Sequence, residues 1–268
     1  MPKINVRGVD LYYEDTDTDG ETMLFSHGLL MNLHMFDDQI AHFKSRFRCI
    51  AYDHRGQGRS QVTKRGYDMD TIYEDAVSLI QALDIAPVHF VGLSMGGFVG
   101  MRLGARRPDL VRSLVLMETS ADSEPGENIL RYNLLRFVAR WLSLKLIVNG
   151  ASKSLFGKTF LGDPSKRDRL AHWKKQIAQN DRVGASRAAA GVFTRQSVYE
   201  EIETITAPTL IIVGEEDVAT VPAKAERIHG QINGSRMVRI PEAGHSASVE
   251  QPQAVIEAMK AFYDSIGV

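Results

Sequence analysis

Apolar residues follow two different spacings along the first half of the chain. Short runs of consecutive apolar residues predict buried strands, and longer segments with apolar residues every three or four positions predict amphipathic helices. The predicted strands cover residues 3–6, 9–13, 22–25, 48–52, 89–91 and 113–117. The predicted helices cover residues 34–47, 71–83 and about ten residues from Gly97 onward. This alternation predicts an α/β fold with a doubly wound, mostly parallel sheet, whose functional residues lie at the C-terminal edge of the strands.

The alternation stops after Met117. Helical patterns recur instead at residues 128–148, 152–160, 164–180 and 182–194. A strand pattern returns at 208–214, another follows at 237–240, and the last helix is expected at 252–266. We therefore predict a core domain formed by residues 1–120 and 207–268, with a helical cap of residues 121–206 inserted after the sixth strand.

Composition and charge narrow the classes of function. A chain of 268 residues, 44% of them apolar, can bury a sizeable core. The 32 basic and 33 acidic residues give a net charge of −1, so there is no electrostatic reason to expect nucleic acid or an anionic membrane as a partner. A small-molecule substrate is expected instead.

The cysteine content and the N-terminus add two expectations. Cys49 stands in an apolar strand pattern and is interpreted as a buried thiol, not as a nucleophile. The chain starts without an apolar leader and contains no run of about 18 apolar residues, which favours a cytoplasmic protein. The oligomeric state does not follow from the sequence.

A serine stands between a predicted strand and a predicted helix. The motif Gly92-Leu93-Ser94-Met95-Gly96 places very small residues two positions before and two after Ser94. Only such residues fit a turn this tight. The motif therefore predicts a nucleophile elbow, in which Ser94 stands above the sheet on a strained backbone.

A serine nucleophile needs a base, and the base needs an orienting acid. Glu215, Glu216 and Asp217 all follow the strand at 208–214. We favour Asp217 because it stands four residues beyond the strand residues 210–213 and five residues before Pro222, which restarts a helix. His245 follows the strand at 237–240 in a glycine-containing loop and is the best-placed base. The order serine, acid, histidine is the one that this layout requires.

Backbone amides are predicted to stabilise an oxyanion next to Ser94. Gly28 directly follows a buried strand, so the loop can turn the amide of Leu29 toward the site, and the amide of Met95 supplies the second donor. His27 is interpreted as a brace for this loop. The charged turn at 53–60 lacks the Gly-Lys-Ser/Thr ending of a phosphate-binding loop and is interpreted as structural.

Bulky apolar residues predict an apolar substrate pocket. The candidates are Phe137, Trp141 and Phe156 from the cap and Leu30 and Val218 from the core loops. For any one of these cap residues taken alone, core packing is favoured over substrate contact, whereas the bulky cap residues as a group favour an apolar substrate.

Several of these motifs together resemble the α/β-hydrolase fold superfamily. They are Ser26-His27-Gly28, Asp53-His54-Arg55-Gly56-x-Gly58-x-Ser60, Gly92-x-Ser94-x-Gly96-Gly97, Gly214-x-x-Asp217 and Gly244-His245. The resemblance covers almost the whole chain apart from the cap, and the chain is similar to the branch of small esterases, non-haem perhydrolases and enol-lactone hydrolases. It implies an eight-stranded sheet, a Ser94–Asp217–His245 triad, and an oxyanion hole from the amides of Leu29 and Met95. Neither a cofactor nor a metal is expected. Leu29 stands where some relatives have an aromatic residue.

The predicted activity is hydrolysis of carboxylic esters of small to medium, largely apolar substrates through an acyl-enzyme. Hydrolysis of an enol-lactone or acyl-homoserine lactone and hydrolysis of a carbon–carbon bond are the enzymatic alternatives. A noncatalytic ligand-binding receptor is the alternative from another class. A cap arginine aimed into the pocket, such as Arg136, Arg187 or Arg195, would favour a carboxylate-bearing substrate, whereas solvated arginines would carry no such meaning.

Overall fold

The computed structural model describes residues 2–268, except for the side chains of residues 128–131. Within this range the strands form one eight-stranded sheet in the order β1-β2-β4-β3-β5-β6-β7-β8. Their bounds are β1 Lys3–Val6, β2 Val9–Asp15, β3 Thr22–Ser26, β4 Arg48–Tyr52, β5 Val88–Leu93, β6 Val111–Met117, β7 Thr209–Gly214 and β8 Arg236–Ile240. The neighbouring strands β4, β3, β5, β6, β7 and β8 are parallel to one another. The pairs β1–β2 and β2–β4 are antiparallel. The predicted mostly parallel sheet is confirmed.

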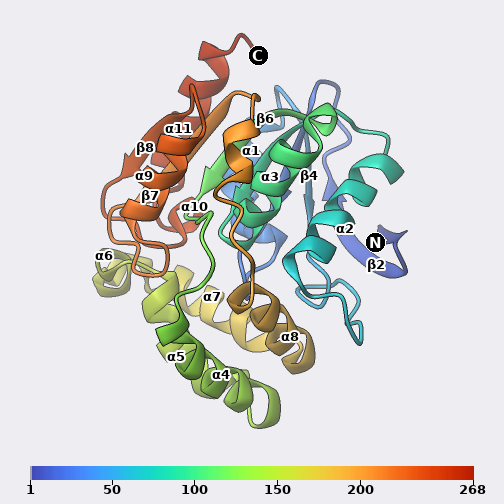
Figure 1. Cartoon of the computed structure of the whole chain (residues 1–268). Coiled ribbons are helices and arrows are strands. Elements are labelled where there is room, and N and C mark those ends of the chain that lie inside the picture. The colour runs from blue at the N-terminus through green and yellow to red at the C-terminus, as the bar shows by residue number, and fades with distance from the viewer. Residues whose placement is uncertain (1) are drawn as a thin grey trace.

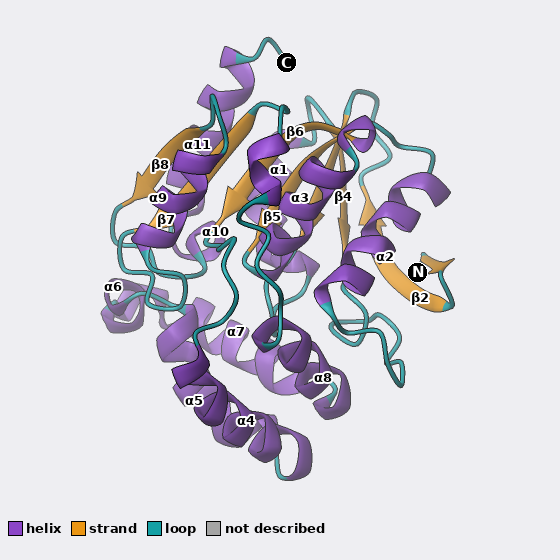
Figure 2. Ribbon diagram, viewed as in Figure 1, coloured by secondary structure: helices purple, strands orange, loops and turns teal. Residues whose placement is uncertain are grey.

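Helices cover both faces of the sheet (Figure 2). On one face α2 (Met69–Ala82), α3 (Met95–Arg106) and α9 (Pro222–Gln231) contribute to one buried apolar cluster. On the other face α1 (Asp37–Phe43), α10 (Ala247–Glu250) and α11 (Pro252–Ser265) contribute to a second cluster. All residues of β3, β5 and β7 are buried, as expected for parallel strands covered on both faces. Short 3₁₀ helices span Leu33–Phe36, Pro108–Leu110, Pro164–Lys166 and Glu201–Thr204.

The segment between β6 and β7 is helical, and we call residues 121–206 the cap. Its helices are α4 Gly126–Trp141, α5 Leu144–Leu155, α6 Lys158–Gly162, α7 Arg167–Gln179 and α8 Arg182–Phe193. Figure 1 shows them grouped together below the sheet, beyond the ends of its strands. None of the helices within residues 2–268 combines the length and the apolar character needed to cross a membrane.

Two of the helices predicted in the cap are wrong, because each contains a break. The helix predicted over 128–148 is broken between Trp141 and Leu144, where the Ser143 side chain accepts a hydrogen bond from the amide of Lys145 and caps α5. The helix predicted over 152–160 is broken between Leu155 and Lys158. Apolar spacing continues across both breaks, so periodicity alone did not reveal them.

The backbone of helix α8 lies directly against the backbone of the core loops. A Cβ atom on Gly184 would lie 1.9 Å from the carbonyl oxygen of Gly56, and one on Gly191 would lie 1.6 Å from that of Tyr67. Neither backbone can yield to such an overlap at low cost. The two glycines, seven residues apart on one helix, therefore permit the close contact between cap and core.

Candidate active site

Ser94 is the single residue between β5 and α3, and its backbone is strained. Its φ of 53° and ψ of −107° lie in a region that residues with a side chain rarely adopt. A Cβ on Gly92 would lie 2.3 Å from the carbonyl oxygen of Gly96, and one on Gly96 would lie 1.9 Å from that of Ser26. These contacts explain why the sequence has glycine at both positions. The strand–turn–helix geometry expected of a nucleophile elbow is present.

The structure brings Ser94, His245 and Asp217 together in one chain of hydrogen bonds. Nε2 of His245 lies 2.9 Å from Ser94 Oγ, and Nδ1 of His245 lies 2.9 Å from Asp217 Oδ2. All three side chains are buried. Because Ser94, Asp217 and His245 follow β5, β7 and β8 respectively, three strand ends of one sheet edge supply the group.

Asp217 is held as an ionised carboxylate. Burial alone would raise its pKa, but His245 and the hydrogen bonds that Asp217 accepts outweigh burial, so the pKa lies below its usual value. The amides of Ala219 and Thr220 donate to Oδ1 at 2.8 and 2.9 Å, and the Thr220 hydroxyl donates to Oδ2 at 2.8 Å. Thr220 was not foreseen from the sequence, because a short polar residue in a loop gives no signal of such a contact.

The neighbouring candidate acids have other surroundings. Glu216 accepts hydrogen bonds from the amide and the hydroxyl of Thr159, at the start of α6 in the cap. Glu215 is exposed. Of the three carboxylates after β7, the structure therefore brings Asp217 to the histidine.

Glu250 is a buried carboxylate that fixes the loop around His245, and the sequence reasoning missed it. Its Oε2 accepts from the amide of Gly244 at 3.0 Å, and its Oε1 accepts from the amide of Ser246 at 3.0 Å, so it binds the backbone on both sides of the histidine. Oε2 also accepts from the amide of Gly157, in the cap, at 2.7 Å. Glu250 therefore ties the histidine loop to the connection between α5 and α6.

Replacing Glu250 with glutamine is expected to lower kcat about 10- to 100-fold, because an amide group cannot accept all three hydrogen bonds and the imidazole loses its fixed position. KM should change little. The measurement is ester hydrolysis per active site, with sites counted from the initial burst of released product. Glu257→Gln, an exposed change on α11, is the matched control. A Glu250→Gln protein that keeps full kcat per site would show that Glu250 serves stability alone.

The two predicted oxyanion donors come from different elements: Leu29 lies in the loop after β3, and Met95 is the first residue of α3, directly after Ser94. The amides of Leu29 and Met95 donate no hydrogen bond within the described part of the chain, whereas the amide of Leu30 donates to Gln57 Oε1 at 2.7 Å. The carbonyl of Leu30 accepts from Asn180 Nδ2 at 2.9 Å, so a residue at the end of α7 also holds this loop. Among the described residues, the amides of Leu29 and Met95 therefore have no competing hydrogen-bond acceptor, as the predicted role requires.

His27 has the bracing contacts that the sequence interpretation assigned to it. Its Nδ1 donates to the carbonyl of Gly28 at 2.7 Å, and its Nε2 accepts from the amide of His54 at 3.0 Å. Burial lowers the pKa of His27, which keeps the ring neutral as these contacts require. In the charged turn that follows β4, Arg55 forms two hydrogen bonds of 2.6 Å with Asp75, and both side chains are buried. Both observations agree with a structural role.

A cavity of about 570 Å³ lies between core and cap and contains Ser94 and His245 in its lining. Leu30 and Val218 line it as predicted. Phe137 and Trp141 do not: they are 58% and 66% exposed on α4. Among the α4 residues whose side chains are described, Tyr132, Leu135, Arg136 and Ala139 line the cavity, at the spacing of one helix face.

Phe156 is the third predicted pocket residue that the structure places elsewhere. It is 2% exposed, stacks on Phe160 at a ring-centroid distance of 5.3 Å and belongs to the same buried apolar cluster as residues of α1 and α11. The alternative of interior packing therefore applies to Phe156. The apolar lining comes instead from other residues of several elements, among them Leu29, Phe98, Leu144, Ile147 and Val192.

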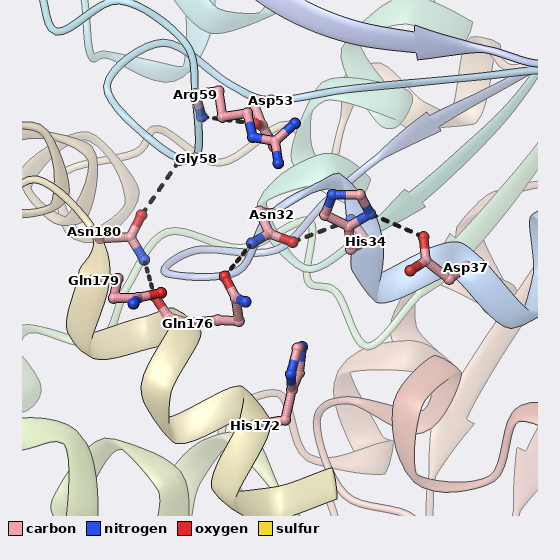
Figure 3. Close-up of a pocket in the computed structure, with 10 residues that line it drawn as sticks. All are labelled: Asn32, His34, Asp37, Asp53, Gly58, Arg59, His172, Gln176, Gln179 and Asn180. Atoms are coloured by element: carbon pink, nitrogen blue, oxygen red, sulfur yellow. Dashed lines mark hydrogen bonds and ion pairs between the residues drawn. The ribbon is translucent and has the colours of Figure 1, made fainter.

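A second, polar cavity of about 530 Å³ separates the core loops from α7 (Figure 3). Hydrogen bonds cross its walls: Asn32 Nδ2 donates to Gln176 Oε1 at 3.2 Å, and the amide of Gly58 donates to Asn180 Oδ1 at 3.4 Å. His34 points to Asp37, with Nδ1 at 3.1 Å from Oδ1. The cavity contains neither Ser94 nor His245 in its lining, and its polar contacts join the cap to the core.

Known proteins are similar to this chain in sequence and in structure. A family model described as the alpha/beta hydrolase fold matches residues 21–252. The 3-oxoadipate enol-lactonase 2 of Acinetobacter baylyi is 29% identical over 244 residues, which are 91% of this chain and 88% of the enol-lactonase. The crystal structure of an enol-lactonase from Burkholderia xenovorans superposes with a TM-score of 0.91 at 26% identity and covers 98% of this chain and 100% of its own.

A thermophilic esterase from Thermogutta terrifontis, solved with malate bound, superposes with a TM-score of 0.92 at 25% identity over 100% of both chains. Enol-lactonases and esterases are hydrolases, so the relatives agree with one another on the broad class of reaction. The match of the family model over most of the chain, together with the eight-stranded sheet, shows that this protein belongs to the alpha/beta hydrolase family.

Proposed function

We propose that the protein is a serine hydrolase that cleaves carboxylic esters through an acyl-enzyme. The observation that carries this proposal is the continuous hydrogen-bond chain from Ser94 through His245 to Asp217, with Ser94 and His245 at the lining of the cavity between core and cap. Nucleophile, base and orienting acid have the mutual contacts that such a reaction requires. The apolar lining residues favour small to medium substrates with apolar parts.

The first half of the reaction forms an ester on the serine. His245 Nε2 takes the hydroxyl proton as Ser94 Oγ attacks the substrate carbonyl, and the amides of Leu29 and Met95 donate to the oxyanion. Ionised Asp217 holds the His245 Nδ1 proton and stabilises the imidazolium. When the tetrahedral intermediate collapses, the carbon–oxygen bond to the alcohol breaks and His245 gives its proton to the leaving alkoxide.

The second half of the reaction hydrolyses the acyl-enzyme and regenerates the serine hydroxyl. His245 accepts a proton from water, the resulting hydroxide attacks the acyl carbonyl, and collapse of the second tetrahedral intermediate releases the carboxylic acid and the protonated serine. A lactone would follow the same steps with the alcohol still attached to the acyl chain. The enol-lactonase relatives favour this variant as the second candidate. Carbon–carbon hydrolysis and noncatalytic binding have no specific observation in their favour.

Hydrolysis of p-nitrophenyl esters from acetate to decanoate tests the proposal, with a panel of lactones run in parallel. We expect steady-state turnover, with kcat/KM that rises with chain length and then falls once the acyl chain exceeds the cavity. Turnover of lactones alone would favour the second candidate. An absence of turnover on both panels would contradict the assignment as an ester hydrolase.

A further inference from the structure

Arg136 faces the cavity that contains Ser94. It belongs to the row of α4 residues that line this space, and it lies in the cap whereas Ser94 lies in the core. A ligand whose carbonyl reaches Ser94 would therefore have a guanidinium on the cap side of the same cavity.

The guanidinium of Arg136 has donors to spare. Its Nε donates to the carbonyl of Ser186 at 3.1 Å, and its Nη1 donates to Asn133 Oδ1 at 2.8 Å. Both acceptors are neutral, and an arginine carries five N–H donors. No carboxylate pairs with Arg136 among the residues whose side chains the structure describes. Partial burial without an acidic partner lowers its pKa, as expected for a cation whose charge is not balanced nearby.

The other two cap arginines considered in the sequence analysis, Arg187 and Arg195, contact other protein groups. Arg195 lines the cavity, but its Nη1 lies 3.0 Å from Glu124 Oε2 and its guanidinium covers the ring of Phe98 at 4.5 Å. Arg187 donates to the carbonyl of Thr63 at 2.6 Å and is outside the cavity lining. Among the described lining residues, Glu124 supplies the negative charge that neutralises Arg195, whereas Arg136 has no such partner.

We propose that Arg136 binds a carboxylate of the substrate, so that the preferred substrates are esters or lactones that carry a second, free carboxylate. This inference rests on the proposed function and adds the substrate class to it. The planar guanidinium can bind both oxygens of a carboxylate, which fixes the orientation of the ligand as well as its charge. Lys153, exposed at the lining, adds to the positive potential of the cavity.

The test compares monoethyl glutarate, which carries a free carboxylate, with diethyl glutarate, its neutral counterpart of the same acyl chain. The wild-type protein should prefer the monoester. Arg136→Gln should lower kcat/KM for the monoester about 10- to 100-fold, mainly through KM, because hydrogen bonds to a charged group are lost. Its kcat/KM for the diester should change less than about 3-fold. Arg136→Lys should restore part of the activity on the monoester, and Arg187→Gln should resemble the wild type on both esters.

Two results would overturn the inference while leaving the proposed function intact: a wild-type preference for the diester, or an equal loss on both esters in Arg136→Gln. If neither ester is hydrolysed, the proposed function fails, and calorimetric titration with glutarate and with valerate decides the inference separately. Binding of glutarate that Arg136→Gln abolishes, with valerate unaffected, supports it. Glutarate binding that is absent, or unchanged in the variant, overturns it.

Discussion

Replacing Ser94 with alanine is expected to lower kcat/KM for esters by about 10⁵-fold, because the acyl-enzyme can no longer form and the histidine has no hydroxyl to activate. The loss should fall mainly on kcat, since the cavity and the oxyanion donors stay in place. Activity is measured by p-nitrophenol release, and circular dichroism checks that the variant is folded.

Ser248→Ala is a matched control for this loss. Ser248 is another buried serine, and its hydroxyl has no hydrogen-bond partner among the described residues, so its removal should leave kcat/KM within about 2-fold. A Ser94→Ala protein that retains as much activity as Ser248→Ala would rule out Ser94 as the nucleophile.

Replacing Asp217 with asparagine is expected to lower kcat about 10⁴-fold at neutral pH. The side-chain amide can donate to Nδ1 of His245, and that contact would place the ring proton on Nε2, where it blocks transfer from Ser94. The imidazolium would also lose its neighbouring negative charge. Because the pKa of Asp217 lies below its usual value, the wild-type carboxylate stays ionised at neutral and mildly acidic pH, so this loss reflects the normal working state.

Glu216→Gln separates Asp217 from its neighbour in sequence. Glu216 binds Thr159 in the cap instead of His245, so its replacement should cost less than about 10-fold. A larger loss in Glu216→Gln than in Asp217→Asn would mean that the wrong carboxylate has been chosen. Kinetics of both variants at one pH and one substrate give the comparison.

Much of the core was predictable because its signals are local. The strand before Ser94, the helix after it and the two glycines all stand within a few residues, and each has a steric reason that the structure shows. Asp217 and His245 were also within reach, because parallel strands bring their C-terminal ends to one edge. The choice of Asp217 over Glu215 and Glu216 was less secure from sequence, because it depends on contacts across the fold.

The cap was less predictable, because the sequence does not show which face of each cap helix points into the cavity. Apolar residues occur on more than one face of α4, so the sequence pattern did not show that Phe137 and Trp141 face away from the cavity while Arg136 faces into it. Glu250 was missed for a different reason. It accepts hydrogen bonds from backbone amides, one of them 93 residues away in the sequence. Because every residue type except proline has a backbone amide, the sequence does not indicate which residues donate to Glu250.

Covalent labelling by diethyl p-nitrophenyl phosphate tests the central claim most directly. In this reaction Ser94 Oγ would attack phosphorus and displace p-nitrophenolate, which leaves a stable diethylphosphoryl group on the serine. The account predicts one equivalent of p-nitrophenolate per protein, loss of esterase activity in parallel, and a single modified peptide that contains Ser94, with no labelling of Ser94→Ala. Two results would contradict it: a wild-type protein that is neither labelled nor inactivated by the treatment, or inactivation that accompanies a label on another residue.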